Sequence, residues 1–210
     1  MSVSDNTVSV MSVTVNTTMA PVGRWEPNSR GRLQEAALAL YAERGFERTT
    51  AAEIAARAGV SERTFFRHFA DKREVLFGGS ELLEQRIIEG VAGAPATDRP
   101  LDAVARGLEA AAAMLGQFRR DLSRQRHDVI AANPELRERE RAKLADYAAA
   151  VATALRQRGV RALQADLAAD AGMTVLRVAL ERWSRDQADG DLKSIMREAV
   201  EELRAVVGGA

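Results

Sequence analysis

The chain has 210 residues, 46% hydrophobic and 29% charged, which is ordinary for a folded protein with a sizeable core. The absence of cysteine excludes disulfides, thiolate nucleophiles and cysteine-ligated zinc, and favours a reducing cytoplasm. With 30 basic and 30 acidic residues the net charge is zero, which argues against a polybasic tail but leaves nucleic-acid binding open, because that depends on where the charge lies.

The first 23 residues are rich in Ser, Thr, Val and Asn and carry one charge, Asp5. They lack the positive start and sustained apolar run of a signal peptide or membrane anchor, so we expect a disordered tail and no membrane association. Met11 and Met19 are alternative starts of the chain.

A first helix is expected from Ser29, its cap, to Gly45, which closes it. Apolar side chains recur along it at three- and four-residue spacing, at Leu33, Ala37, Leu40 and Tyr41. With later residues of the same region this face makes a core for three helices. The expected core partners are Phe46, Ile54, Ala55, Val60, Phe65 and Phe69.

Two shorter helices follow, separated by a tight turn. Thr50 and Glu53 have the spacing of a capping box that begins a helix over 51–58. Gly59 can take the left-handed conformation that ends it, and Ser61 caps the next helix. Two helices joined by a short glycine-containing turn are typical of the helix-turn-helix, whose second helix enters the DNA major groove.

The stretch ALALYAERGFERTT and the following AAEIAARAGVSERTFFRHFADKREVL resemble the N-terminal domain of the tetracycline-repressor (TetR) family of bacterial transcription regulators. The resemblance covers about residues 29–77. It implies an all-α protein with a helix-turn-helix DNA-binding domain at 24–79 and a larger helical effector-binding and dimerisation domain at 80–210. It also implies a repressor, less often an activator, that a small molecule releases from a palindromic operator.

The predicted DNA-reading helix begins at its cap, Ser61. Arg63 and Arg67 lie one turn apart on it, and their forked guanidinium groups match guanine O6 and N7. Phe66 falls on the outer side, where the family usually has a tyrosine, and the family places a DNA-backbone lysine at the position of Lys72. The full predicted DNA-binding set is Thr50, Ser61, Glu62, Arg63, Thr64, Phe66, Arg67, His68 and Lys72.

Asp71 and Glu74 form a second predicted capping box, which places Lys72 in the first turn of the next helix. Gly78 and Gly79 should kink or restart that helix, which then runs to about Glu89. The Pro- and Gly-containing segment 90–100 is the expected linker. Helical periodicity predicts the remaining helices at 101–115, 118–132, 134–158, 163–185 and 192–207.

The last two predicted helices are candidates for a dimer interface. The helix at 163–185 is apolar on two sides, so it needs two partners. The final helix is strongly amphipathic. Together they could bury one face within the chain and offer another to a second copy, and the resemblance implies a homodimer through a four-helix bundle of this kind.

An effector site is the less specific prediction. Arg126 interrupts an apolar stripe and has no acid three or four residues ahead of it, so it is a candidate ligand for an anion. The segments RHDVIAANPELRERERAKL and VLRVALERW resemble effector domains of TetR members that sense acyl-type ligands. The predicted effector residues are Met114, Phe118, Leu122, Arg126, Ile130, Arg177 and Trp183.

No catalytic triad, metal-ligand spacing or phosphate-binding glycine loop occurs in the chain, so we expect neither an enzyme nor a cofactor. The predicted partners are a double-stranded DNA operator, a small-molecule effector and a second copy of the chain. The remaining alternative is a helical small-molecule-binding or scaffold protein without specific DNA binding.

Overall fold

The structure is a computed structural model that describes residues 28–116, 120–185 and 190–208. The predicted disordered tail at 1–23 and the predicted effector residue Phe118 lie outside these ranges. Within them the regular structure is entirely helical, which confirms the all-α prediction.

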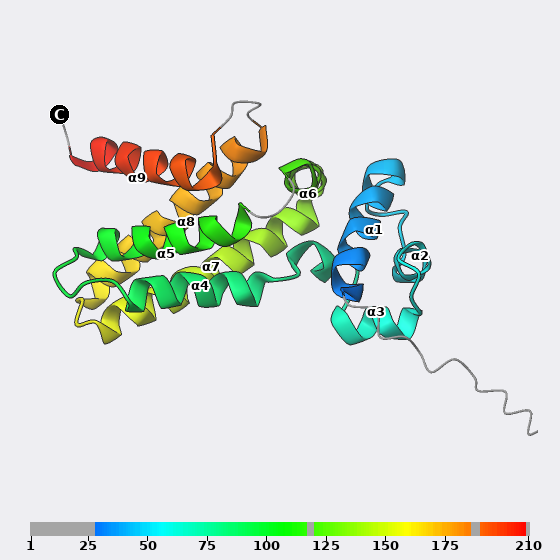
Figure 1. Ribbon diagram of the computed structural model, residues 1–210, viewed down its shortest axis with the longest axis horizontal. Helices are drawn as coiled ribbons and strands as arrows, with labels where there is room; N and C mark the ends of the chain where they lie inside the picture. Colours follow the sequence, from blue (N-terminus) through cyan, green and yellow to red (C-terminus); the bar gives the residue numbers. More distant parts are fainter. Residues whose placement is uncertain (1–27, 117–119, 186–189, 209–210) are drawn as a thin grey trace, which may run out of the picture.

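The helices form two groups that lie end to end (Figure 1). The first group gathers the three N-terminal helices, and a short 3-10 turn, η1, leads from it into a bundle of longer helices. In chain order the elements are α1 (Ser29–Arg44), α2 (Ala51–Arg57), α3 (Glu62–His68), η1 (Glu74–Phe77), α4 (Ser80–Ala92), α5 (Pro100–Leu115), α6 (Arg120–Ala132), α7 (Pro134–Gln157), α8 (Ala162–Arg185) and α9 (Leu192–Gly208).

Side-chain caps set the N-terminal helices. The Thr50–Glu53 capping box is present at α2, and Ser61 caps α3 by accepting a hydrogen bond from the Thr64 N–H at 3.2 Å. Gly59 has φ +68°, the left-handed conformation expected between the two helices. One prediction was wrong: Asn28 rather than Ser29 caps α1, because its side-chain oxygen reaches the Gly31 N–H at 3.1 Å.

The N-terminal core contains the predicted residues, all of them buried except Val60, which is half-buried at its edge. Phe65 is completely buried and Phe69 nearly so, which fixes α3 in this core. The same apolar cluster also takes in Val129 and Ile130 of α6, and Leu136 of α7. The two groups of helices therefore share a continuous core at their junction.

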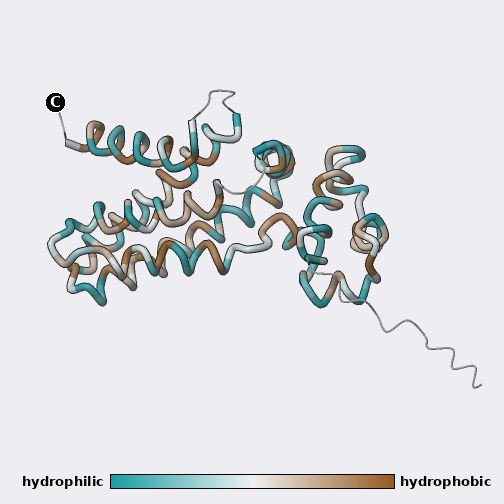
Figure 2. The backbone as a smooth tube through the Cα atoms, in the orientation of Figure 1, coloured by the Kyte–Doolittle hydropathy of each residue, from teal (hydrophilic) through white to brown (hydrophobic). Residues whose placement is uncertain are grey.

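The bundle core is built largely from alanine and other small residues of α4, α5, α7, α8 and α9. Figure 2 shows hydrophobic and hydrophilic residues alternating along these helices, as expected of amphipathic elements. Small residues allow close approach: a Cβ on Gly90 of α4 would lie 2.6 Å from the Cα of Gly107 on α5. None of the described helices is long and apolar enough to cross a membrane.

The segment around residue 80 differs from the prediction in two ways. The second capping box is only half formed: Asp71 accepts hydrogen bonds from the N–H groups of Arg73 and Glu74, but the Glu74 carboxylate turns away to α7. The result is a 3-10 turn instead of a full helix, followed by the predicted restart after Gly79, whose φ is +98°. In addition, α4 runs to Ala92, because Gly90 belongs to the helix and packs closely on Gly107 of α5, so the linker is shorter than the predicted 90–100.

Candidate functional site

The exposed face of α3 is the most distinctive surface of the N-terminal group. The buried Phe65 and the C-terminal Phe69 hold the helix from below, which leaves Glu62, Arg63 and Arg67 exposed to solvent. Arg63 and Arg67 are four residues apart and share one side of the helix. Among the described residues Arg63 makes no hydrogen bond or ion pair, so its guanidinium remains available to a ligand.

Phe66 lies on the same exposed part of α3. Its side chain is 53% exposed, and its ring meets the edge of Phe65 at 5.2 Å between centroids. A large exposed aromatic gains little from folding, so contact with a partner is the simpler explanation for it. The side chain cannot donate a hydrogen bond to phosphate, as the tyrosine usual in the TetR family would.

The predicted polar residues beside this face are partly committed to the protein itself. The Thr50 hydroxyl donates to Glu53 at 2.8 Å within the capping box. The Thr64 hydroxyl lies 3.0 Å from that of Ser61, and Thr64 is half-buried. These groups therefore position α2 and α3 first, and any contact with a ligand is additional.

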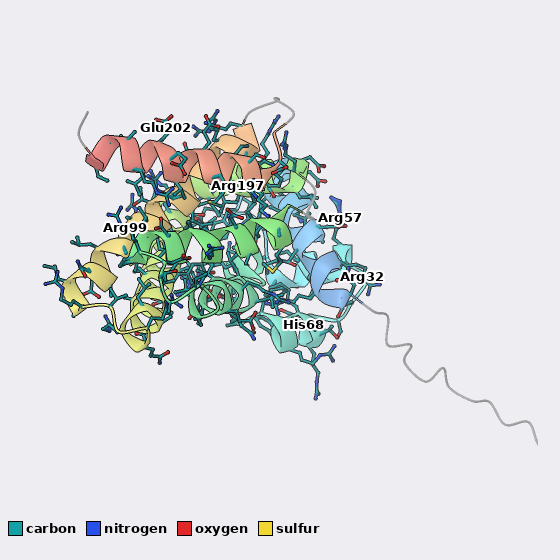
Figure 3. The ribbon with its side chains drawn as sticks, turned by 60° about the vertical axis from the view of Figure 1, so that its left-hand side comes forward. Arg32, Arg57, His68, Arg99, Arg197 and Glu202 are labelled. Atoms are coloured by element: carbon teal, nitrogen blue, oxygen red, sulfur yellow. The ribbon has the colours of Figure 1, made fainter. Side chains whose placement is uncertain are left out.

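His68 ties the end of α3 to the start of α1. Its Nε2 lies 2.8 Å from the Ser29 hydroxyl. Burial, together with the charges of Arg67 and Arg30, lowers the pKa of His68, so the imidazole is neutral at pH 7. In Figure 3 His68 lies at the same end of the molecule as Arg32 and Arg57.

Lys72 has a structural role that the sequence did not reveal. Its ammonium group donates to the carbonyl oxygens of Phe46, Glu47 and Thr49 at 2.9, 3.2 and 3.1 Å, which uses all three donors. It also lies 4.3 Å from the centre of the Phe46 ring. Because η1 begins only at Glu74, Lys72 is not in the first turn of a helix as predicted, and it fastens the loop between α1 and α2.

The predicted effector residues lie at separate places. Leu122, Arg126 and Ile130 of α6 are at the junction of the two helix groups, where Ile130 and Leu122 pack on the N-terminal core. Arg126 donates to the Leu76 carbonyl at 2.7 Å and lies 3.4 Å from Glu140, a partner fourteen positions away in sequence. Burial lowers its pKa, and Glu140 opposes that shift.

Other predicted effector residues belong to the bundle. Met114 is half-buried on α5, and Trp183 is buried on α8 with the Arg120 guanidinium 5.3 Å from its ring centre. Arg177 is exposed and pairs with Glu181 at 3.4 Å, the neighbour one turn ahead. The described effector candidates are thus divided between the junction and the bundle, and a common effector site for them stays a prediction.

A hollow of about 420 Å³ between α5 and α9 was not predicted. Arg197 of α9 reaches Glu109 of α5 at 3.0 Å and lies between the two helices in Figure 3. Arg204, near the end of α9, pairs with Asp102, near the start of α5. The sequence signal was present as oppositely charged residues at helical spacing on both helices, but it does not say which helices are neighbours.

An apolar surface runs along α8 and the end of α9. Leu163 and Leu167 are 72% and 62% exposed, and Val178 is 42% exposed. Val206 and Val207 of α9 are also exposed. On the other side of α8, Met173, Leu176 and Trp183 are buried in the bundle, so this helix has one apolar side inside and another outside.

Two family models match the chain. Residues 33–77 match the model of the bacterial regulatory proteins of the tetR family, and residues 98–208 match the model described as the MftR C-terminal domain. The chain belongs to the TetR family. The first model spans most of α1 and the helix-turn-helix of α2 and α3, and the second spans α5 to α9, so the family assignment predicted from the sequence is confirmed.

Curated relatives of this TetR protein are transcription regulators by name. It is 36% identical over 98 residues to the HTH-type transcriptional regulator TcmR of Streptomyces glaucescens, which covers 47% of this chain and 39% of TcmR. It is 45% identical over 47 residues to the HTH-type transcriptional repressor KstR2 of Mycobacterium tuberculosis, 22% of this chain and 24% of KstR2. The chain thus spans less than half of the length of these relatives.

Solved structures share the fold over most of the chain. Bacillus subtilis FadR in complex with stearoyl-CoA has a TM-score of 0.59 at 20% identity, covering 86% of this chain and 99% of that one. The SmeT–triclosan complex has a TM-score of 0.57 at 22% identity, covering 85% and 90%. At these identities the likeness establishes the fold alone.

Proposed function

We propose that the protein is a ligand-responsive transcription regulator, most simply a repressor, that binds a palindromic operator in the cytoplasm as a homodimer. The observation that carries this proposal is the α3 surface, where Arg63, Phe66 and Arg67 are exposed on a helix fixed by buried Phe65. TetR membership and the names of the curated relatives support it. An exposed arginine pair on a rigid helix suits the reading of base edges in the major groove.

Capture of genomic fragments by the purified full chain tests this function. Enrichment of a discrete palindromic sequence is the expected result. Retention of DNA without sequence preference, lost as salt is raised, would contradict the proposal and favour the alternative of a helical binding or scaffold protein. The recovered sequence would also reveal the neighbouring genes.

Replacement of Arg63 by alanine separates base reading from phosphate binding. Loss of a bidentate guanine contact should weaken operator binding by about 1 to 3 kcal/mol and relax preference at one base pair of each half-site. Arg99→Ala, a remote exposed position with the same change in charge, is the control. If Arg63→Ala weakens binding to every operator variant equally, Arg63 contacts the DNA phosphate backbone, and Arg67 would be the residue that reads the bases.

We further propose that the apolar surface of α8 and α9 forms the dimer interface. Leu167 is 62% exposed in one chain, so Leu167→Arg should leave the monomer folded while placing a charge in the interface. Sedimentation should then give a folded monomer with much weaker operator binding. A dimer of unchanged stability would place the interface elsewhere.

For the effector we propose a mainly apolar molecule, with or without an anionic end. The structures of FadR with stearoyl-CoA and SmeT with triclosan support this class by analogy of fold. Trp183, buried under the Arg120 guanidinium, is the best-placed reporter in the bundle. In a Trp25→Phe chain the remaining tryptophan is Trp183. Addition of stearoyl-CoA or triclosan to this variant should change the tryptophan fluorescence and release operator DNA. If neither probe causes either change, these two molecules are excluded as effectors.

A further inference from the structure

The 3-10 turn η1 connects the two groups of helices along the chain, and helices α1, α6 and α7 contact it. Its residues Val75, Leu76 and Phe77 are buried. On one side the amide of Gln34, from α1, donates to the carbonyl oxygens of Val75 and Gly78 at 3.4 and 3.1 Å. The turn is therefore firmly attached to the DNA-binding group.

On its other side η1 is held by α6. Arg126 donates through Nε to the Leu76 carbonyl at 2.7 Å, and its guanidinium carbon lies 5.2 Å from the Phe77 ring centre. Glu140 of α7 lies 3.4 Å from the same guanidinium. A half-buried arginine that is bonded on two sides fixes the distance between the elements that it joins.

Helix α7 holds η1 through Glu74. The Glu74 carboxylate accepts from Arg139 Nε at 2.6 Å and lies 3.6 Å from Lys143 Nζ. Arg139 and Lys143 are four residues apart, so both project from one side of α7. The Glu74 and Lys143 side chains are only 21% and 17% exposed, which makes this contact stronger than an ordinary surface ion pair.

Helix α7 also contacts the chain beyond the break between η1 and α4. Gly79, with φ +98°, separates η1 from α4. The Tyr147 hydroxyl, one turn past Lys143, donates to the Ser80 carbonyl at 3.1 Å in a buried position. Helix α7 therefore contacts the chain on both sides of Gly78 and Gly79.

From this arrangement we propose that Glu74 and Tyr147 are positioning residues, through which α7 bridges the Gly78–Gly79 break and sets the orientation of the DNA-binding domain. The inference rests on the proposed function for its consequence on operators, but the orientation itself is a property of the free protein. α7 has 24 residues, about 36 Å of helix, and packs on α4 and α8 in the bundle. A displacement of α7 in the bundle is thereby carried to the reading helix.

The orientation can be measured without DNA because the chain has no cysteine. Spin labels are placed at Glu62→Cys on α3 and Gln157→Cys at the end of α7, both exposed positions, with labelled chains diluted into unlabelled protein. In the labelled chain that keeps Glu74 and Tyr147, the distance between the two labels should have one narrow distribution. Glu74→Gln and Tyr147→Phe should broaden it, whereas Arg137→Gln, an exposed arginine of α7 without a contact to η1, should not.

The reversed pair Glu74→Arg with Arg139→Glu should restore the narrow distribution if the ion pair acts through its geometry. On the recovered operator, Glu74→Gln should bind about five- to tenfold more weakly and lose part of its preference for the native half-site spacing. A simple loss of folding would instead lower the helical signal in circular dichroism. If Glu74→Gln loses that signal, Tyr147→Phe, which removes only one hydroxyl, decides the question.

The outcomes separate the two proposals. A narrow distribution in every variant, or a broad one in the starting protein, overturns the bridging role of α7 whatever the protein binds. A broadened distribution in the variants, in a protein that recovers no discrete operator, supports the bridging role and overturns the proposed function. Equal spacing preference in Glu74→Gln and Arg137→Gln would show that the orientation does not govern operator choice.

Discussion

The two groups of helices begin their helices in different ways. In the DNA-binding group, α1, α2 and α3 each start with a side chain that accepts a backbone hydrogen bond, from Asn28, Thr50 and Ser61. In the bundle, α4, α5 and α7 start without such a bond, whereas at the start of α9 Asp191 accepts one from the Ser194 N–H at 2.7 Å. The caps matter most for α2 and α3, because helices of seven residues have few internal hydrogen bonds.

The two cores also differ in the size of their side chains. The DNA-binding core depends on large rings, among them Phe46, Phe65 and Phe69, whose shapes fix three short helices. The bundle core depends on small residues that bring backbones together, as at Gly90 and Gly107. The first core should therefore be damaged by making residues smaller, and the second by making them larger.

The largest expected effect is in the DNA-binding core. Phe65→Ala removes a completely buried ring from this core, and should lower the free energy of unfolding by about 3 to 5 kcal/mol. Urea unfolding followed by circular dichroism, at fixed protein concentration, measures the change. A loss below about 1 kcal/mol would mean that the core collapses around the gap and that ring shape matters little there.

The bundle should respond to an added methyl group. Helix propensity alone favours alanine over glycine by about 1 kcal/mol, yet a Cβ on Gly107 would lie 2.5 Å from the Ile87 carbonyl oxygen. Gly107→Ala should therefore destabilise the protein by about 1 to 3 kcal/mol. Gly208→Ala, where nothing lies within 4 Å, is the control and should be neutral or slightly stabilising. Equal effects at both positions would refute close packing of α4 on α5.

The smallest expected effect is a pH dependence at the contact between α1 and α3. The folded-state pKa of His68 lies below its ordinary value of 6.5, so the unfolded chain binds more protons as the pH falls. The stability from neutral His68 is complete above about pH 6.5 and is lost as pH falls towards the folded-state pKa. His68→Gln, compared with His127→Gln as control, should give a flatter dependence of melting temperature between about pH 7 and 5. An unchanged slope would show that His68 is not responsible.

The sequence predicts the DNA-binding group well because its rules are local. The capping box at Thr50, the left-handed Gly59 and the cap at Ser61 involve residues within a few positions of each other, and all three are confirmed. Helical periodicity likewise predicts the bundle helices, with boundaries that shift by a few residues. Only the start of α1 and the turn η1 depart, and at η1 a distant partner attracts the Glu74 carboxylate.

The sequence does not reveal what charged side chains do across long separations. The sequence favours Lys72 as a phosphate ligand, which stays a prediction, but it does not reveal that Lys72 donates to carbonyl oxygens 23 to 26 positions earlier. The sequence likewise favours Arg126 as an anion ligand, which stays a prediction, but it does not reveal the hydrogen bond from Arg126 to the Leu76 carbonyl, 50 positions away. Hydrogen bonds to main-chain oxygens leave no trace in residue identity, because every residue has a carbonyl group.

The Arg126 contact with the Leu76 carbonyl has a consequence for exchange between homologous regulators. The acceptor is a main-chain oxygen, so the turn can change its side chains without losing the bond, provided that it keeps the 3-10 conformation. A helix-turn-helix from another family member could therefore be grafted onto this bundle at the turn with this attachment intact. Chimaeras joined there should tolerate unrelated operator specificities better than chimaeras joined inside α4.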